Sequence, residues 1–235
     1  MNLVLLTEED FQQGNLVSLT GERAEHIIKT IRVKIGDSLT VGLINNLMGI
    51  GIVTELSNTT VTLCVELNSQ APTPLPVRLI LALPRPKVLR RTIAACSSFG
   101  IKEFVLINSY RVEKSYWNSP LLQPEQLNKH LTLGLEQAKD TILPSIRLAK
   151  RFKPFVEDEL SSLLESSKGI VAHPYADDHC PKNTSGHITL AVGPEGGFIP
   201  YEIDKLAEAG FQSISLGPRI LKVETAIPFL LGKLL

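Results

Sequence analysis

A glycine-rich segment with one carboxylate, GPEGGF at residues 193–198, stands between an apolar run and a helical pattern. Its three glycines predict a backbone that a ligand can approach closely, because glycine carries no Cβ atom. No Lys-Ser/Thr pair closes the segment, as it would in an ATP-binding loop, and the first spacing of a dinucleotide-binding GxGxxG motif is absent. Glu195 stands where a nucleophile elbow carries serine, so the segment does not cleave esters in that way either.

A second polar segment, AHPYADDHCPKNTSGH at residues 172–187, holds enough potential ligands to suggest a metal site. The spacing matches no zinc pattern, and we predict a polar connection between two strands with no metal bound. His173 remains a candidate binding residue, because it ends a predicted strand. The potential ligands are His173, Asp177, Asp178, His179, Cys180 and His187.

Two clusters of basic residues could contact phosphate groups. Lys87, Arg90 and Arg91 have the i, i+3, i+4 spacing that places side chains on one face of a helix. Phosphate binding and a solvated surface remain open for both clusters. The second cluster, in the segment IRLAKRFK, consists of Arg147, Lys150, Arg151 and Lys153.

The composition indicates a globular protein without a general affinity for nucleic acid. The chain has 235 residues, 43% of them hydrophobic, and a formal net charge of +0, so a nucleic-acid site must be a local patch. No run of about 18 uncharged apolar residues predicts a membrane span, and the early acidic residues of MNLVLLTEED do not fit a signal peptide. The three cysteines Cys64, Cys96 and Cys180 fit reduced thiols better than disulfides. We therefore expect a soluble, cytoplasmic protein with no membrane partner.

Residues 1–72 predict a small antiparallel β-barrel. Short alternating runs such as SLTVGLI, GIGIVTEL and TVTLCVEL are separated by clusters of turn-forming residues. One segment, ERAEHIIKTIRV, has helical spacing instead and predicts a helix that plugs or flanks the barrel. The apolar residues with this spacing are Ala24, Ile27, Ile28 and Ile31.

A linker near residue 72 separates this barrel from a second predicted domain, residues 73–235. The segment NSQAPTPLPV packs three prolines into a few residues, which resists both helix and central strand. Beyond it, apolar strand patterns alternate with amphipathic helices, so we predict an α/β domain with a mostly parallel sheet. The segments HPY, GPEGGF and LGPRIL all follow predicted strands, where the ligands of such sheets bind.

Three C-terminal segments, GIVAHP, LAVGPEGGFIPYEI and SLGPRILKVETA, closely resemble the motifs of a known enzyme family. This family methylates N3 of a uridine in 16S ribosomal RNA and belongs to the SPOUT superfamily of knotted methyltransferases. The segment HIIKTIRVKIGDSLTV is similar to the PUA-like, RNA-binding barrel of the same family, and the likeness covers nearly the whole chain.

The resemblance implies S-adenosylmethionine as the methyl donor, a deep trefoil knot in the second domain, a homodimer, and 16S ribosomal RNA or the small subunit as partner. It makes Arg32 and Lys34 of the barrel, with Lys87, Arg90 and Arg91, the expected RNA-binding residues. GPEGGF would form one wall of the cofactor pocket. The expected cofactor-binding residues are Ala172, His173, Gly193, Pro194, Glu195, Gly196, Gly197, Leu216, Gly217, Ile220 and Leu221.

The chain departs from the family pattern in segments that face RNA. Ala95 and Ser98 stand where the family has lysine and glutamate, and Asp140 and Ile142 stand at its usual arginine positions. The segment KVETA, residues 222–226, stands where the family has RTETA. A paralogue with a different RNA target, and an RNA-binding dimer without catalytic activity, therefore remain alternatives.

Methylation of uridine N3 requires loss of the N3 proton, and the negative charge shared with O2 and O4 must be stabilised. Arg219 and Arg111 match arginines of the family and could supply a fixed positive charge. A structural ion pair is the alternative for Arg219, and a solvated loop for Arg111. Glu195 could accept a hydrogen bond from a cofactor amine, orient Arg219, or serve the following helix N-terminus. For Glu224, which follows the LGPRIL segment, the same choice between a functional and a structural role remains open.

Overall fold

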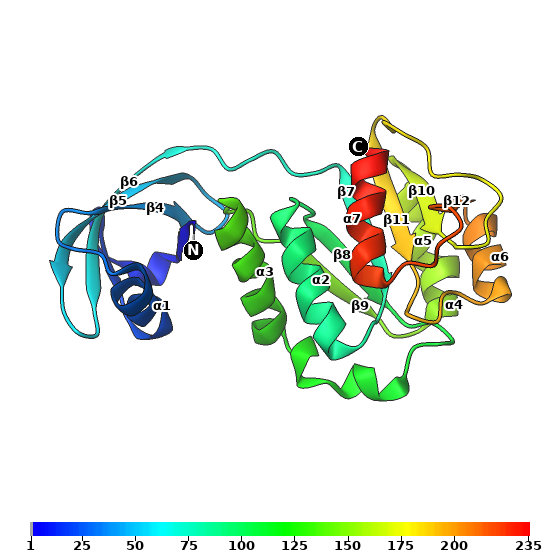
Figure 1. Ribbon diagram of the computed structural model, residues 1–235, viewed down its shortest axis with the longest axis horizontal. Helices are drawn as coiled ribbons and strands as arrows, with labels where there is room; N and C mark the ends of the chain where they lie inside the picture. The colour runs from blue at the N-terminus through cyan, green and yellow to red at the C-terminus, as the bar shows by residue number, and fades with distance from the viewer. Residues whose placement is uncertain (1) are drawn as a thin grey trace. The chain divides into compact units, whose positions relative to one another are not determined.

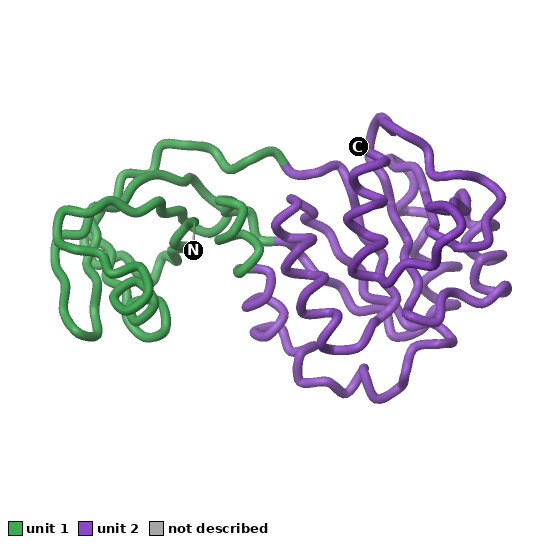
Figure 2. The backbone as a smooth tube through the Cα atoms, in the orientation of Figure 1, with its two compact units in different colours: residues 1–73, 132–143 green, residues 74–131, 144–235 purple. Residues whose placement is uncertain are grey.

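The computed structural model describes residues 2–235, which divide into two compact units (Figures 1 and 2). Unit 1 contains the residues up to Thr73 together with Thr132–Leu143, and unit 2 contains Pro74–Leu131 and Pro144–Leu235. The expected boundary near residue 72 agrees with the first break between the units, but the expected domain 73–235 includes residues 132–143, which here belong to unit 1. The assignment of functions to the two domains stays a prediction. Within residues 2–235, no helix has both the length and the apolar character needed to cross a membrane.

Unit 1 is built on one mixed, six-stranded sheet with the order β1-β4-β5-β6-β3-β2. The antiparallel pairing expected from the alternating runs is confirmed for four of its pairs, but β1 runs parallel to β4. A parallel pair needs a long crossover, and the chain between these two strands is long enough to provide one. The strands are β1 (Val4–Leu6), β2 (Phe11–Gln13), β3 (Leu16–Leu19), β4 (Ser38–Leu43), β5 (Met48–Leu56) and β6 (Val61–Ser69).

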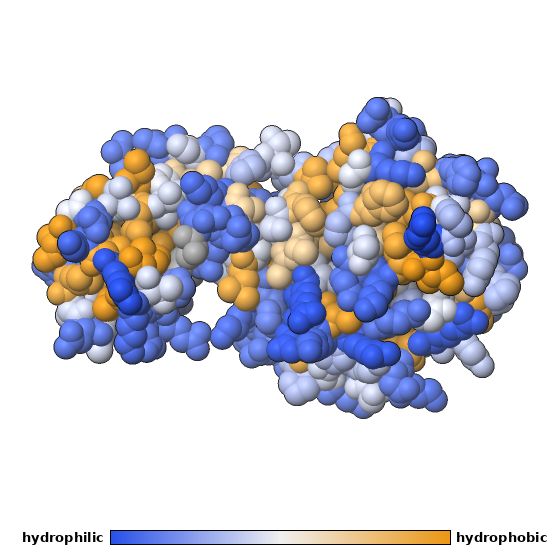
Figure 3. Space-filling view, in the orientation of Figure 1, coloured by the Kyte–Doolittle hydropathy of each residue, from blue (hydrophilic) through white to orange (hydrophobic). Residues whose placement is uncertain are grey.

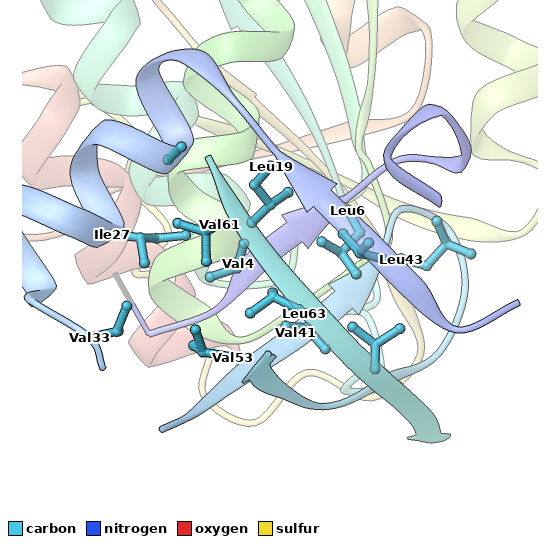
Figure 4. Close-up of a cluster of buried hydrophobic side chains, with 13 residues drawn as sticks. Val4, Leu6, Leu19, Ile27, Val33, Val41, Leu43, Val53, Val61 and Leu63 are labelled. Carbon is cyan, nitrogen blue, oxygen red and sulfur yellow. The ribbon is translucent and has the colours of Figure 1, made fainter. Parts of the chain in front are cut away.

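The core of unit 1 lies between the sheet and one helical segment (Figure 4). Helix α1 (Gly21–His26) continues into a π-helical turn, Ile27–Ile31, and Arg32 ends it in the left-handed conformation with φ of 61°. Ala24 and Ile27 are fully buried against the strands and Ile28 is partly buried, which confirms the expected helix. Ile31, expected at the same helical spacing, is exposed instead. Figure 3 shows hydrophobic residues at the surface of unit 1. The large apolar residues of unit 1 that are exposed to solvent are Leu16, Ile31, Ile35, Ile50 and Ile52.

Residues 132–143 are tied to unit 1 by hydrogen bonds to its β4–β5 turn. Helix α3 (Pro124–Ala138) begins in unit 2 and ends within this segment. The Thr141 hydroxyl donates to the Asn46 carbonyl at 2.5 Å, and the Leu143 N–H donates to the Asn45 side chain at 2.9 Å. Asp140, at a position where the resemblance expects arginine, is buried and accepts the Ile142 N–H at 2.9 Å. Its carboxylate shapes this turn and does not face solvent.

Unit 2 contains an all-parallel sheet with the order β12-β10-β11-β7-β8-β9, which confirms the predicted α/β fold. Its central strands are almost entirely apolar and buried, as strands covered on both faces must be. The strands are β7 (Val77–Ala82), β8 (Glu103–Ile107), β9 (Ser145–Ala149), β10 (Ser167–Ala172), β11 (His187–Val192) and β12 (Phe211–Ile214).

Helices cover the parallel sheet, and two of them pack against each other. Helix α2 (Pro86–Ser98) contacts α7 (Val223–Leu234), and both lie on the face that is turned to the viewer in Figure 1. Helix α5 (Leu160–Leu164) contacts β10, and α6 (Pro200–Glu208) contacts β12. Strand β9 and helix α7 were not predicted from the sequence. Because all six strands are parallel, the segments that follow them meet at one edge of the sheet.

Candidate functional site

A pocket of about 220 Å³ lies where the segments after β10, β11 and β12 meet. Every residue that the resemblance assigned to the cofactor lines it, and so do Arg111 and Arg219. Glu224 is not among its lining residues. The pocket also contains residues that sequence reasoning missed, because they extend the three motifs or begin α7: Pro174, Tyr175, Val192, Phe198, Ile214, Val223 and Ala226.

A positive φ angle or a lack of space for a Cβ atom accounts for the four glycines in the pocket wall. Gly197 and Gly217 adopt φ of 72° and 110°, which side chains rarely tolerate. Gly193 has no room for a side chain, because a Cβ atom would lie 3.0 Å from the Phe198 backbone nitrogen. Gly196 faces Arg111, whose Cδ would lie 3.0 Å from a Cβ at that position. These glycines therefore allow the tight turn and the close approach of Arg111.

Glu195 binds the loop after β7. Its carboxylate accepts the Arg85 backbone N–H at 3.1 Å and lies 3.8 Å from the Arg85 Nε. Within residues 2–235 it forms no hydrogen bond or ion pair with Arg219, so the suggested orientation of that arginine is not observed. A role of Glu195 toward a cofactor or in catalysis stays a prediction.

Arg111 and Arg219 both line the pocket, and both are exposed to solvent. The Arg111 guanidinium donates a hydrogen bond to the Gly196 carbonyl, so this arginine is attached to the GPEGGF segment. Arg219 forms no ion pair or hydrogen bond with the described residues, which leaves its guanidinium without the structural partner that the alternative interpretation requires.

His173 has a buried polar atom without a hydrogen-bond partner in the part of the chain that the structure describes. Its Nδ1 is buried and has no hydrogen-bond partner among residues 2–235. Burial lowers the pKa of His173 below its usual range, so the ring is neutral at pH 7. The ring packs edge-on against Tyr175 at a centroid distance of 5.7 Å. His173 lines the pocket, and a buried ring nitrogen without a partner in such a residue calls for an explanation, which a polar group of a ligand could provide.

Glu202 was missed by sequence reasoning, although it is a buried carboxylate beside the pocket. It accepts the N–H of Ile199 at 3.0 Å, as the third residue of a helix does toward its N-cap. The usual sequence signal of this arrangement begins with Ser or Thr, and Ile199 occupies that position here. Only the Glu at the third helical position could have indicated it.

The basic residues expected to bind RNA are exposed. Lys87, Arg90 and Arg91 lie on α2, and Arg32 and Lys34 lie in unit 1 after the π-helical turn. Their role toward RNA stays a prediction.

The second basic cluster is partly neutralised by neighbouring side chains. Arg147 pairs with Glu159 and lies over the Phe155 ring at 5.3 Å, and Lys153 lies 3.7 Å from Glu157. These contacts favour a structural role for this cluster.

Neither the histidine-rich segment nor the cysteines form a further site in the described part of the chain. No three His, Cys, Asp or Glu side chains in residues 2–235 are placed to share a metal ion. All three cysteines are free thiols, and burial raises the pKa of Cys96 to about 12. Such a thiol is not a nucleophile at neutral pH.

Comparisons with known proteins agree with this arrangement. The model of the RNA methyltransferase domain family matches residues 71–235. The chain is 27% identical to "Ribosomal RNA small subunit methyltransferase E 1" of Borreliella burgdorferi, over 96% of this chain and 94% of that protein. It is 30% identical to "Ribosomal RNA small subunit methyltransferase E" of a Synechocystis species, over 89% of this chain and 69% of that protein.

Solved structures show the same fold over nearly the full length. A small-subunit ribosomal RNA methyltransferase E from Neisseria gonorrhoeae, bound to S-adenosylmethionine, superposes with a TM-score of 0.73 at 19% identity, over 96% of this chain and 93% of that one. A Legionella pneumophila structure with bound S-adenosylmethionine gives a TM-score of 0.75 at 21% identity, over 98% and 95%.

Proposed function

Because this chain belongs to the RNA methyltransferase family that contains the ribosomal RNA small subunit methyltransferases E, we propose that it methylates N3 of a uridine in 16S ribosomal RNA, with S-adenosylmethionine as donor. The observation that carries the proposal is that the three family motifs meet in one pocket. They come from separate strands, and all eleven residues expected to bind the cofactor line that pocket.

The lining residues fit S-adenosylmethionine. Half-buried Leu216 and buried Val192 offer apolar surface, the unpaired His173 Nδ1 offers a polar contact, and the glycines expose backbone groups. The fit is supported by the two related structures that hold this cofactor. When bound, S-adenosylmethionine supplies a methyl group that its sulfonium has already activated.

Arg219 and Arg111 are the residues that we assign to the uracil. With the proton of N3 lost, the base carries negative charge on N3, O2 and O4, and a fixed guanidinium at the pocket stabilises it. Arg219 is suited to this role because no described residue pairs with its charge. Arg111 reaches the same pocket from the loop after β8, and its bond to the Gly196 carbonyl holds it at the pocket wall.

The proposal includes RNA contacts by the exposed cations of α2 and of unit 1. Lys87, Arg90 and Arg91 present three positive charges on one helix, and phosphate binding releases counterions from RNA. Arg32 and Lys34 present two further exposed positive charges on unit 1, which we propose is an RNA-binding domain. The departures at Ala95, Ser98, Asp140 and Ile142 bear on the choice of RNA, so a different RNA target is one outcome of the test below.

We also propose a trefoil knot, a homodimer and a cytoplasmic location. The knot is supported by the path after β12: the chain passes from the sheet edge, along the pocket, to α7, which packs on α2. The dimer is supported by Phe229 of α7, an apolar residue that is 44% exposed. The free cysteines fit a reducing compartment.

Two measurements test the function. Titration calorimetry with S-adenosylmethionine and with its demethylated product should show binding of both, and the absence of binding would remove the enzyme assignment. Radiolabelled methyl transfer to ribosomal RNA from a strain that lacks this protein then separates the alternatives. Uptake into 16S RNA supports the proposal, uptake into another RNA supports a different target, and binding of RNA without uptake supports an inactive dimer.

A further inference from the structure

Glu202 is a buried carboxylate that binds two backbone N–H groups and no cation in residues 2–235. Its side chain belongs to the first turn of α6, and the residue is 2% exposed. One carboxylate oxygen accepts the Ile199 N–H at 3.0 Å, and the other accepts the Tyr110 N–H at 2.7 Å. Both oxygens therefore act as acceptors, toward donors from two separate segments.

These two donors belong to loops that are not adjacent in the sheet. Tyr110 follows β8 and Ile199 follows β11, and β7 lies between these strands. Neighbouring strands are about 4.8 Å apart, so β8 and β11 are separated by about 10 Å. A side chain with an acceptor on each side can join their loops, whereas backbone pairing within the sheet cannot.

The loop that Glu202 holds is the one that carries Arg111. Tyr110 and Arg111 are the central residues of a turn closed by the Val112 N–H and the Ser109 carbonyl at 3.1 Å. The Tyr110 side chain is 80% exposed, so it packs little against the protein. The bond from the Tyr110 N–H to Glu202 consequently anchors the Ser109–Tyr110 peptide unit, one residue before Arg111 in the same turn.

A second carboxylate of the same segment makes the equivalent connection to the intervening loop. Glu195 accepts the Arg85 N–H, and Arg85 follows β7. The segment from Glu195 to Glu202 thus binds the loops after β7 and β8, one with each carboxylate. Only the Glu202 bond reaches the turn that presents a guanidinium to the pocket.

We propose that Glu202 is a positioning residue that sets Arg111 at the pocket wall for the methyl-transfer step. The inference rests on the proposed function, since it assigns Arg111 a place in that reaction. The carboxylate fixes the backbone before Arg111, and the Gly196 carbonyl fixes its guanidinium. Loss of either contact allows the arginine to leave the position from which it stabilises charge.

Replacement of Glu202 by Gln tests this. The amide keeps the size of the side chain but places an NH₂ donor against one of the two N–H groups. We expect a single-turnover methylation rate at least tenfold lower, with the dissociation constant of S-adenosylmethionine changed less than about threefold. Glu208→Gln is the matched control, because it removes an exposed carboxylate of the same helix that pairs with Lys205, and it should retain the full rate.

A double-mutant cycle separates positioning from general stability. If Glu202 acts through Arg111, Glu202→Gln should lower the rate less than twofold in the Arg111→Ala background. An equal loss in both backgrounds would overturn the proposal, and so would a full rate in the single variant. Amide hydrogen exchange supplies a readout independent of activity: exchange at Tyr110 should rise at least tenfold in Glu202→Gln, and unchanged exchange would also overturn it.

The same experiment distinguishes this inference from the proposed function. If the wild-type chain methylates no RNA, the function fails while exchange at Tyr110 still reports on the anchor. If the wild type is active and the cycle is additive, the inference alone fails. Should Glu202→Gln not fold, Glu202→Asp withdraws both acceptors by one methylene and is expected to show the same dependence on Arg111; a loss independent of Arg111 counts against the proposal.

Discussion

Replacing Arg219 by Ala should separate catalysis from stability, because this arginine has no hydrogen-bond or ion-pair partner among residues 2–235. It is exposed and forms no ion pair with described residues, and Glu195 is bound to Arg85. Such a surface substitution changes the free energy of unfolding by about 0.5 kcal/mol or less, which corresponds to about 2 °C or less in melting temperature. Removal of one donor to a developing negative charge lowers the rate by about a hundredfold or more, or about 2.7 kcal/mol of transition-state stabilisation.

The assay measures single-turnover methyl transfer at saturating S-adenosylmethionine, the affinity for the cofactor by calorimetry, and the melting temperature, all on the same variants. Lys222→Ala is the matched control, because it removes an exposed cation of the same segment that does not line the pocket. Arg219→Lys should restore only part of the rate, since an ammonium does not present a planar fork. A full rate in Arg219→Ala with a melting temperature lowered by about 6 °C or more would refute the reasoning, because broken buried ion pairs have effects of that size.

Three further predictions concern the pocket wall, unit 1 and the assembly. Gly193→Ala should weaken cofactor binding at least tenfold in calorimetry, because the new Cβ lies 3.0 Å from the Phe198 nitrogen and the loop must move; unchanged affinity would contradict the pocket assignment. In Asp10, burial acts to raise the carboxyl pKa, but hydrogen bonds from Arg23 and Thr7 outweigh it and hold the pKa below its usual range. Its stabilisation is therefore present above about pH 4, the unfolded pKa, and is lost as the pH falls through the lower folded pKa. Asp10→Asn should lower the melting temperature at pH 7 and converge with the wild type on acidification, and a pH-independent difference would argue against this. Light scattering at micromolar concentration should give the mass of a dimer, and a monomer mass would exclude that assembly.

The parallel sheet and the pocket could be predicted because their signals are local. GPEGGF and LGPRIL each follow an apolar run, and parallel strands bring such segments to one edge. The two motifs therefore line the same pocket, to which they contribute Gly193 and Gly217.

Helix α7 and strand β9 could not be predicted with the same ease. Helix α7 contains Pro228 and Gly232 and is apolar on most sides, so its helical period is hidden. Strand β9 contains Arg147, a charged residue that does not fit the apolar pattern expected of a buried strand. The strand tolerates it because β9 lies at the edge of the sheet and pairs with a neighbouring strand on one side only. The grouping of residues 132–143 with unit 1 depends on hydrogen bonds to Asn45 and Asn46, which are distant in sequence. Long-range partners of this kind leave no local pattern.

The central claim, methylation of uridine N3 in 16S ribosomal RNA, is tested most directly by identifying the product. The purified chain is incubated with isotopically labelled S-adenosylmethionine and small ribosomal subunits from a strain that lacks it, and the 16S RNA is digested to nucleosides for mass spectrometry. The account predicts labelled 3-methyluridine, from one position of the 16S RNA, in amounts that fall with Arg219→Ala. Label in any other nucleoside, or no label in RNA at all, would contradict it.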